Sequence, residues 1–116
     1  MVMTSFSVRP LSAELSVAPQ LGPEAMAWVA QQGFKSIINN RPDFEAGPEQ
    51  PTHAAVEAAA KVAGLAYAFL PVDPVYQSAE EVARFADLLA SMPKPILAFC
   101  RSGNRSGRLF QAATLE

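Results

Sequence analysis

The chain has a single cysteine, Cys100, and a short segment rich in serine, glycine and arginine follows it directly. The segment consists of Arg101, Ser102, Gly103, Asn104, Arg105 and Ser106. Successive backbone amides of such a loop can point inward and bind an oxyanion, and nearby positive charge favours a thiolate over a thiol. A planar guanidinium at Arg105 can hold two oxygens of a tetrahedral anion. The pattern predicts a reactive thiolate at Cys100 in a loop that binds a small anionic substrate.

The segments on either side of this loop predict a strand before it and a helix after it. Residues 95–99 form a short, continuous apolar run, which is typical of a strand covered on both faces. Residues 108–110 could begin a helix. Open α/β sheets bind their ligands at the carboxyl ends of the strands, where a helix N-terminus adds partial positive charge. We therefore expect Cys100 at the carboxyl edge of a sheet.

The rest of the chain alternates between strand-like and helix-like periodicity, and its ten prolines mark many of the boundaries. Strands are predicted at 34–38 and 65–72, with a short strand or hairpin at 6–11 and 14–17. Helices are predicted at 23–33 and 52–63, and a third begins at a capping box formed by Ser78 and Glu81. The proline-rich segment 41–51 is predicted to be a loop. This alternation predicts a single α/β domain over residues 1–116, with a mostly parallel sheet flanked by helices.

Composition excludes several classes of protein. The 116 residues suffice for one hydrophobic core, and 50% of them are hydrophobic, which is unlike a disordered chain. The net charge of −2 argues against a nucleic acid as partner. One cysteine and one histidine cannot form an intramolecular disulfide, a multi-cysteine zinc site or an iron–sulfur cluster. We therefore expect no bound metal and no cofactor.

Neither a signal peptide nor a membrane span is predicted. Residues 1–17 lack the continuous apolar core of a signal peptide, and no run reaches the ~18 apolar residues of a membrane helix. We expect a cytoplasmic protein with a free thiol and no membrane partner. Leu115 and Glu116 could be the remnant of an expression tag, and the chain stops ten residues after Ser106. These features suggest a trimmed chain or one domain of a longer protein.

Three stretches of the sequence resemble the phosphatase-like domain of beta-lactamase-hydrolase-like proteins. In chain order they are 34–45, 64–67 leading to 70–72, and 96–106. The resemblance implies a fold like that of dual-specificity phosphatases, with Cys100 as nucleophile and Arg105 as oxyanion clamp. It also implies that the backbone from Arg101 to Arg105 forms the anion cradle and that Ser106 hydrogen-bonds the thiolate.

Two charged residues outside the loop are candidates for the same site. Asp73 follows a predicted strand and lies 27 residues before Cys100. The resemblance to dual-specificity phosphatases implies a general acid there, and an ordinary turn carboxylate is the equal alternative. Arg41 follows another predicted strand at the same edge, where it would bind substrate or join a local salt-bridged cluster with Asp43 and Glu45.

Other conspicuous side chains are expected to be structural. His53, at the start of a predicted helix, has neither a visible partner nor metal-ligand spacing, so we expect a solvated residue rather than a base. Met26, Trp28 and Phe85 lie at helical spacing and are expected in the core.

The loop also resembles that of rhodanese-type sulfurtransferases, which leaves phosphorus and sulfur chemistry open. Protein tyrosine phosphatases place five residues between cysteine and arginine and usually a histidine before the cysteine; here four residues intervene and Phe99 precedes. The first hypothesis is a hydrolase that forms a phosphocysteine on Cys100. The second is a sulfurtransferase that carries a persulfide on Cys100, with a separate or fused sulfur-oxidising domain as its partner. The third is a non-catalytic module that binds anions or senses redox changes.

Overall fold

A five-stranded sheet forms the centre of the computed structural model, which describes residues 7–114. The strands are β1 (Arg9–Pro10), β2 (Leu15–Ala18), β3 (Ser36–Asn39), β4 (Ala66–Phe69) and β5 (Ile96–Phe99). Their order is β1-β2-β5-β3-β4, and every neighbouring pair is parallel except β1 with β2. Because β5 is the central strand in this order, Cys100 directly follows the central strand of the sheet. The predictions for residue 6 and for residues 115–116 lie outside the described residues.

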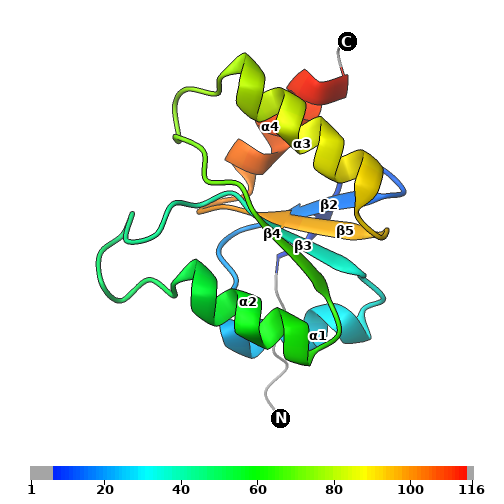
Figure 1. Ribbon diagram of the computed structural model, residues 1–116, viewed down its shortest axis with the longest axis vertical. Helices are drawn as coiled ribbons and strands as arrows, with labels where there is room; N and C mark the ends of the chain where they lie inside the picture. Colours follow the sequence, from blue (N-terminus) through cyan, green and yellow to red (C-terminus); the bar gives the residue numbers. More distant parts are fainter. Residues whose placement is uncertain (1–6, 115–116) are drawn as a thin grey trace.

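Helices cover the sheet in two layers, one on each face (Figure 1). The short helices η1 (Pro23–Ala25) and α1 (Met26–Gln31) lie with α2 (His53–Val62) on one face, and α3 (Ala79–Ser91) and α4 (Asn104–Thr114) lie on the other. Parallel strands need crossover connections, and α1, α2 and α3 supply them. This arrangement confirms the predicted α/β domain with a mostly parallel sheet flanked by helices.

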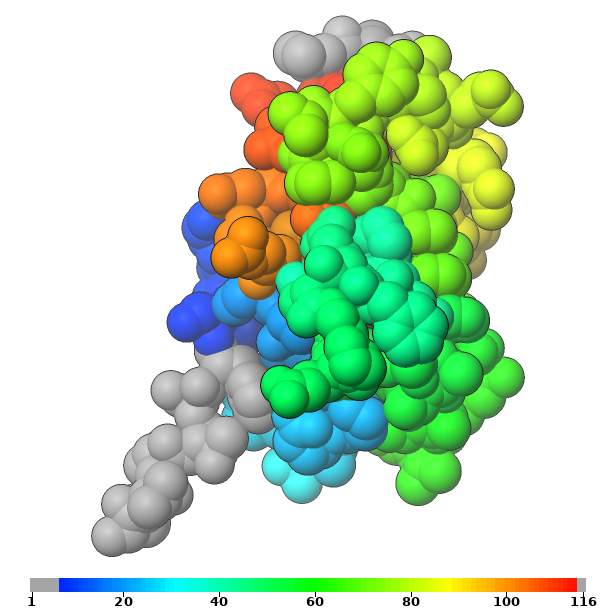
Figure 2. Space-filling view, turned by 90° about the vertical axis from the view of Figure 1, so that its left-hand side faces the viewer, coloured from blue at the N-terminus to red at the C-terminus, as the bar shows by residue number. Residues whose placement is uncertain are grey.

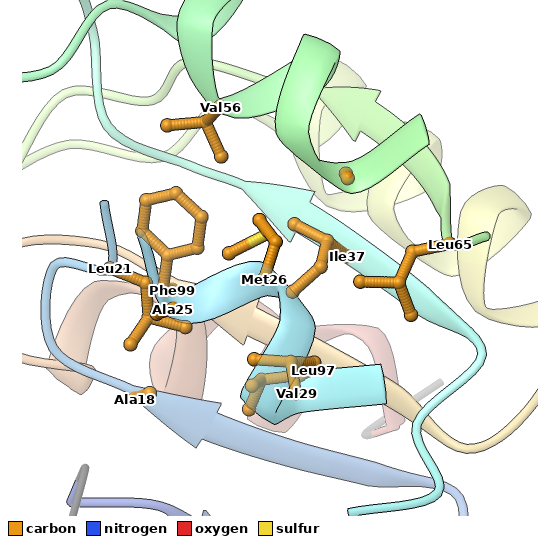
Figure 3. Packing of buried hydrophobic residues seen from close by; sticks show 11 residues of the cluster. Ala18, Leu21, Ala25, Met26, Val29, Ile37, Val56, Leu65, Leu97 and Phe99 are labelled. Atoms are coloured by element: carbon orange, nitrogen blue, oxygen red, sulfur yellow. The ribbon is translucent and has the colours of Figure 1, made fainter. Parts of the chain in front are cut away.

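The central strand β5 contributes to two hydrophobic clusters because both of its faces are covered. Leu97 and Phe99 belong to the cluster beside α1 and α2, part of which is drawn in Figure 3. Ile96 and Ala98 belong to the cluster beside α3 and α4. All four residues are buried, as the continuous apolar run predicts. Burial of one large apolar side chain stabilises a fold by about 1.5–3 kcal/mol, so the strand that carries the cysteine is firmly anchored.

Two helices begin at side-chain caps that fix the ends of the loops before them. The Glu81 amide donates to Ser78 Oγ at 3.1 Å, and the Ser78 amide donates to Glu81 Oε1 at 2.8 Å, which is the predicted capping box of α3. Thr52 caps α2 by accepting a hydrogen bond from the Ala55 amide at 3.2 Å. Both loops that end at these caps lead from the carboxyl edge of the sheet.

Two sequence-based expectations about the elements need correction. The strand predicted over 65–72 ends at Phe69, although the Leu70 amide still donates to the Asn39 carbonyl at 2.9 Å beside β3. Trp28 is only partly buried and packs at the border of the cluster beside α1 and α2, whereas the other predicted core residues are fully buried.

The last helix starts earlier than the sequence predicts. α4 begins at Asn104, not near Arg108, so Arg105 and Ser106 lie in its first turn. Amides in the first turn of a helix have no partner within the helix and remain available to other acceptors. The cysteine loop therefore runs directly into the first turn of α4.

Candidate active site

Three loops meet around Cys100 at the carboxyl edge of the sheet. Figure 2 shows this face, with the orange segment after β5 beside the cyan-to-green loop after β3, and with the green loop after β4 above them. Parallel pairing explains the convergence, because Phe99 at the end of β5 is in register with Ala18 and Asn39 at the ends of its two neighbours. Residues that follow these strands are thereby brought together, as expected from the sequence.

The side chain of Cys100 is 1% exposed and is held by its own loop. The Gly103 amide donates to Sγ at 3.0 Å. Burial would raise the pKa of this thiol, but hydrogen bonds from the amide and hydroxyl of Ser106 and from the amides of Ser102 and Gly103 lower the pKa below its ordinary value. The thiolate, which is the nucleophilic form of cysteine, is therefore favoured. Hydrogen bonds from the loop lower this pKa. The sequence had also suggested that the positive charge of Arg105 would lower it.

Gly103 lets the loop pass close to the neighbouring strand. Its φ is 93°, and a Cβ atom placed there would lie 3.4 Å from the backbone of Ala18. Positive φ strains residues other than glycine. The loop is also tied to the segment after β2, since the Gln20 amide donates to the Arg101 carbonyl at 3.3 Å. Glycine at this position thus allows the turn that brings an amide onto the sulfur.

Arg105 is buried, with 4% of its surface exposed, and two of its nitrogen atoms are bound. Nη1 donates to the Val72 carbonyl at 3.0 Å, and Nη2 donates to Glu45 Oε1 at 3.1 Å. The buried Nε has no hydrogen-bond partner among residues 7–114. A buried donor of a charged group is costly to leave unpaired. Arg105 lines the same pocket as Cys100, so its guanidinium group lies close to where an anion at the thiol would bind.

Glu45 joins Arg105 to Arg41, which is also buried. Arg41 Nε donates to Glu45 Oε1 at 2.8 Å, and Arg41 Nη1 donates to Gln20 Oε1 at 3.1 Å. Burial would raise the pKa of Glu45, but hydrogen bonds and charge from Arg105 and Arg41 hold it below its usual value. The sequence indicated the local pair with Arg41 but not the contact with Arg105. One carboxylate oxygen thus positions two arginines.

The Ser106 hydroxyl has a partner that the sequence did not indicate. It donates to Asn40 Oδ1 at 2.8 Å, and Asn40 Nδ2 donates to the Leu70 carbonyl at 2.9 Å. Both polar side chains are fully buried. The sequence held one indication that Asn40 lies near the cysteine loop: Asn40 follows a buried strand that ends at the same edge of the sheet.

A pocket of about 540 Å³ includes Cys100 in its wall. It is lined by Arg41, Glu45, Ala46, Pro74, Cys100, Arg101, Ser102, Asn104, Arg105 and Arg108. Most of the candidate residues named from the sequence are therefore in one place. Gly103 and Ser106 are buried and contact the thiol, while Asp73 does not line the pocket. Four guanidinium groups and one carboxylate give this pocket a net positive charge, which favours anions.

Asp73 binds its own loop rather than the pocket. Its Oδ1 accepts hydrogen bonds from the amides of Val75 at 2.8 Å and Tyr76 at 3.0 Å. These two bonds, with a smaller contribution from Arg105, hold the pKa of the exposed carboxyl below its usual value. A carboxylate that caps a turn and stays ionised is a poor proton donor at neutral pH. In this conformation the Asp73 carboxylate caps its own turn and does not line the pocket.

His53 is not the solvated residue that its sequence position suggests. Its ring stacks on Phe69 with centroids 4.0 Å apart, and Nε2 lies 3.9 Å from Asp43 Oδ2. Two-thirds of the side chain is covered, since 34% is exposed. The stacking partner comes from β4, which lies far from His53 in sequence and could not be foreseen.

Neither a metal-binding cluster nor a membrane helix was found in the described part of the chain. Residues 7–114 contain no group of three or more histidine, cysteine or acidic side chains placed to hold a metal ion. Within the same residues, no helix is long and apolar enough to cross a membrane.

Solved phosphatase structures share this fold. A putative phosphatase from Neisseria meningitidis matches with a TM-score of 0.81 and 33% identity, over 88% of this chain and 72% of that one. A Pseudomonas aeruginosa protein solved in complex with phosphotyrosine matches with a TM-score of 0.67 and 18% identity, over 94% of this chain and 62% of that one. The class is therefore that of phosphatase-like enzymes with the fold of tyrosine and dual-specificity phosphatases.

The chain belongs to the family of beta-lactamase hydrolase-like proteins and corresponds to their phosphatase-like domain, because the model of that family matches residues 7–114. A beta-lactamase hydrolase-like protein from Xylella fastidiosa is 35% identical over 100 residues. That match covers 86% of this chain but only 23% of the relative. The resemblance inferred from three sequence stretches is thus confirmed, and the chain spans less than a quarter of this relative.

Proposed function

We propose that this phosphatase-like protein hydrolyses a small anionic phosphate ester through a phosphocysteine on Cys100. The observation that carries the proposal is the pairing of a buried, hydrogen-bonded Cys100 with an Arg105 whose Nε has no partner among the described residues. A thiolate and an unfilled guanidinium donor in one pocket fit a nucleophile beside an oxyanion site. The phosphotyrosine bound by the Pseudomonas aeruginosa relative is an anion of the proposed kind.

In the first half of the reaction, the Cys100 thiolate attacks the phosphorus atom of the substrate. A sulfur–phosphorus bond forms, the bond from phosphorus to the leaving oxygen breaks, and the electron pair departs with that oxygen. In this proposal, loop amides other than that of Gly103, which already donates to Sγ, and the Arg105 guanidinium group stabilise charge on the transferred oxygens.

In the second half, water attacks the phosphorus atom of phosphocysteine. A phosphorus–oxygen bond forms, the sulfur–phosphorus bond breaks with its electron pair returning to Cys100, and the proton from water passes to phosphate or solvent. The hydrogen bonds from Ser106 and Gly103 that lower the pKa of Cys100 also stabilise this departing thiolate. Asp73 has no role in the proposed reaction because its carboxylate caps its own loop.

The sulfurtransferase and the non-catalytic module gain no support from the related proteins described above, whose names concern phosphatases or beta-lactamase hydrolases.

A reactive thiol without a second cysteine in the chain is best kept reduced by its surroundings. We therefore propose a cytoplasmic location.

The test compares the unmodified chain with Cys100→Ser and Arg105→Lys on p-nitrophenyl phosphate, and separately on thiosulfate with cyanide as acceptor. Phosphate release that is lost in Cys100→Ser and reduced about 10²-fold or more in Arg105→Lys supports the proposal. Lysine keeps the charge but cannot supply the Nε donor in the same geometry. Cys100-dependent thiocyanate formation without phosphate release would replace the phosphatase with the sulfurtransferase.

A further inference from the structure

Two exposed arginines add to the positive charge of the pocket. Arg101 and Arg108 are exposed and line the pocket with Cys100. Neither arginine belongs to an ion pair within residues 7–114, and Arg108 donates to the Pro74 carbonyl. These guanidinium groups therefore remain available to an anion at the mouth of the pocket.

The same pocket offers no carboxylic acid to protonate a leaving group. Of the carboxyl side chains in the described residues, only Glu45 lines it. Glu45 Oε1 accepts hydrogen bonds from Arg41 and Arg105, so this carboxyl is held in its ionised form. Asp73 lies outside the lining and is bound to the amides of Val75 and Tyr76. Enzymes gain roughly 10²–10⁴-fold from a positioned proton donor, and this pocket lacks that help.

A leaving group must therefore depart without a proton. The residues that line the pocket indicate which kind of leaving group is favoured. An aliphatic alkoxide is a very strong base, comparable to hydroxide, and is therefore a poor leaving group unless it is protonated. A phosphate group, with a second pKa of about 6, leaves readily as an anion. Apart from Cys100, only Ala46 and Pro74 supply apolar side chains to the lining, so the pocket suits a charged group better than a ring.

Resting on the proposed function, we infer that the substrate is a diphosphate ester whose terminal phosphoryl group passes to Cys100 while Arg41, Arg101 and Arg108 bind the departing phosphate. The sulfur–phosphorus bond forms as the bond between the bridging oxygen and the terminal phosphorus breaks. The electron pair stays on the bridging oxygen, which becomes a terminal oxygen of the released phosphate monoester. Water then releases the phosphoryl group from Cys100 as inorganic phosphate. Guanidinium groups thus take the place of a general acid.

The experiment uses a matched pair of substrates, ethyl phosphate and ethyl diphosphate, with p-nitrophenyl phosphate as the reporter of the proposed function. The first two differ only in the leaving group, so the ratio of their kcat/KM values measures the preference. The ratio is determined for the unmodified chain and for the double variant Arg101→Gln with Arg108→Gln. Arg84→Gln is the matched control, because Arg84 is an exposed arginine on α3 that does not line this pocket.

We expect ethyl diphosphate to be favoured over ethyl phosphate by about 10²-fold or more, the size of the missing proton transfer. The double variant should lose at least about tenfold of this ratio, since charge-assisted hydrogen bonds to the departing phosphate are removed. Arg84→Gln should keep the ratio. Equal rates for the two ethyl substrates, with Cys100-dependent hydrolysis of p-nitrophenyl phosphate intact, would overturn the inference alone. Absence of Cys100-dependent hydrolysis of all three substrates would overturn the proposed function with it.

Discussion

The hydroxyl of Ser106 donates a hydrogen bond to Asn40 Oδ1 at 2.8 Å, and the same hydroxyl lowers the pKa of Cys100. A hydroxyl has one proton to donate. Asn40 and the Cys100 thiolate therefore compete for it, and Asn40 lies 66 residues from Ser106 in the chain. We therefore expect the basicity of the nucleophile to depend on Asn40, a residue of another loop.

This competition predicts pKa changes of opposite sign in two variants. Ser106→Ala removes a donor, so the pKa of Cys100 should rise. Asn40→Ala removes the competing acceptor, so the Ser106 hydroxyl is free for the thiolate and the pKa of Cys100 should fall. The pH dependence of Cys100 alkylation by iodoacetamide measures both, with circular dichroism as the check of folding. Shifts in the same direction would contradict the competition.

Glu45→Gln should destabilise the fold and slow the reaction. Glutamine keeps an acceptor oxygen but loses the charge that binds Arg41 and Arg105, which we expect to cost about 2 kcal/mol. Since Arg105 would be held less firmly, kcat/KM should fall about tenfold or more. Urea unfolding and kinetics measure the two effects. The control is Glu57→Gln, whose exposed pair with Lys61 spans 3.3 Å and should contribute less than about 1 kcal/mol.

The stability that Glu45 provides should also depend on pH. Its pKa in the folded protein lies below the ordinary value of 4.5. The contribution is therefore complete above pH 4.5 and is lost as the pH falls through the folded-state pKa. Unfolding free energies from pH 7 downward should fall more steeply for the unmodified chain than for Glu45→Gln. Parallel pH profiles would show that the pKa of Glu45 is the same in the folded and the unfolded chain, so that its charge adds no stability.

Gly103→Ala should impair catalysis more than its backbone strain alone explains. The new alanine would have a positive φ, which costs about 1–2 kcal/mol, and relief of this strain would move the residue 103 amide away from Cys100 Sγ. Gly33→Ala is the matched control, because Gly33 has a φ of 97° and no atom within 4 Å of the added Cβ. We expect similar losses of stability but a loss of kcat/KM of about tenfold or more only in Gly103→Ala. Equal kcat/KM values for the two variants would show that the turn at Gly103 does not affect catalysis.

Asp73→Asn should change kcat/KM by less than about threefold, far below the roughly 10²-fold effect of losing a general acid. Asparagine Oδ1 can accept the same bonds from the amides of Val75 and Tyr76, so the loop should keep its shape. A loss of about 10²-fold, together with disappearance of a decline in rate at high pH, would restore the general-acid role that the family resemblance implies. The full pH profile of p-nitrophenyl phosphate hydrolysis provides both readings.

The sequence predicted the features that local chemistry determines. The apolar run before Cys100, the capping box at Ser78 and Glu81, and the glycine in the loop each reflect constraints within a few residues. The parallel sheet then follows from alternating helices and strands, and it brings Arg41 to the same edge as Cys100.

The contacts that complete the site join loops that are distant in sequence and could not be read from any one segment. Glu45 reaches Arg105 across 60 positions, and the Ser106 hydroxyl finds Asn40 across 66. Asp73 shows the converse case, because its position implied catalysis while its side chain satisfies two amides of its own turn. Side-chain partners of this kind depend on how loops pack, which neither periodicity nor motif spacing determines.

The central claim, a phosphocysteine on Cys100, is tested most directly by intact-mass spectrometry of protein quenched in acid during turnover of p-nitrophenyl phosphate. The unmodified chain should carry the added mass of one phosphoryl group, located on Cys100 by peptide mapping. The Cys100→Ser variant should carry none and should release no p-nitrophenol. Steady turnover with no phosphoryl adduct on the unmodified chain, or turnover that persists in Cys100→Ser, would contradict the proposed mechanism.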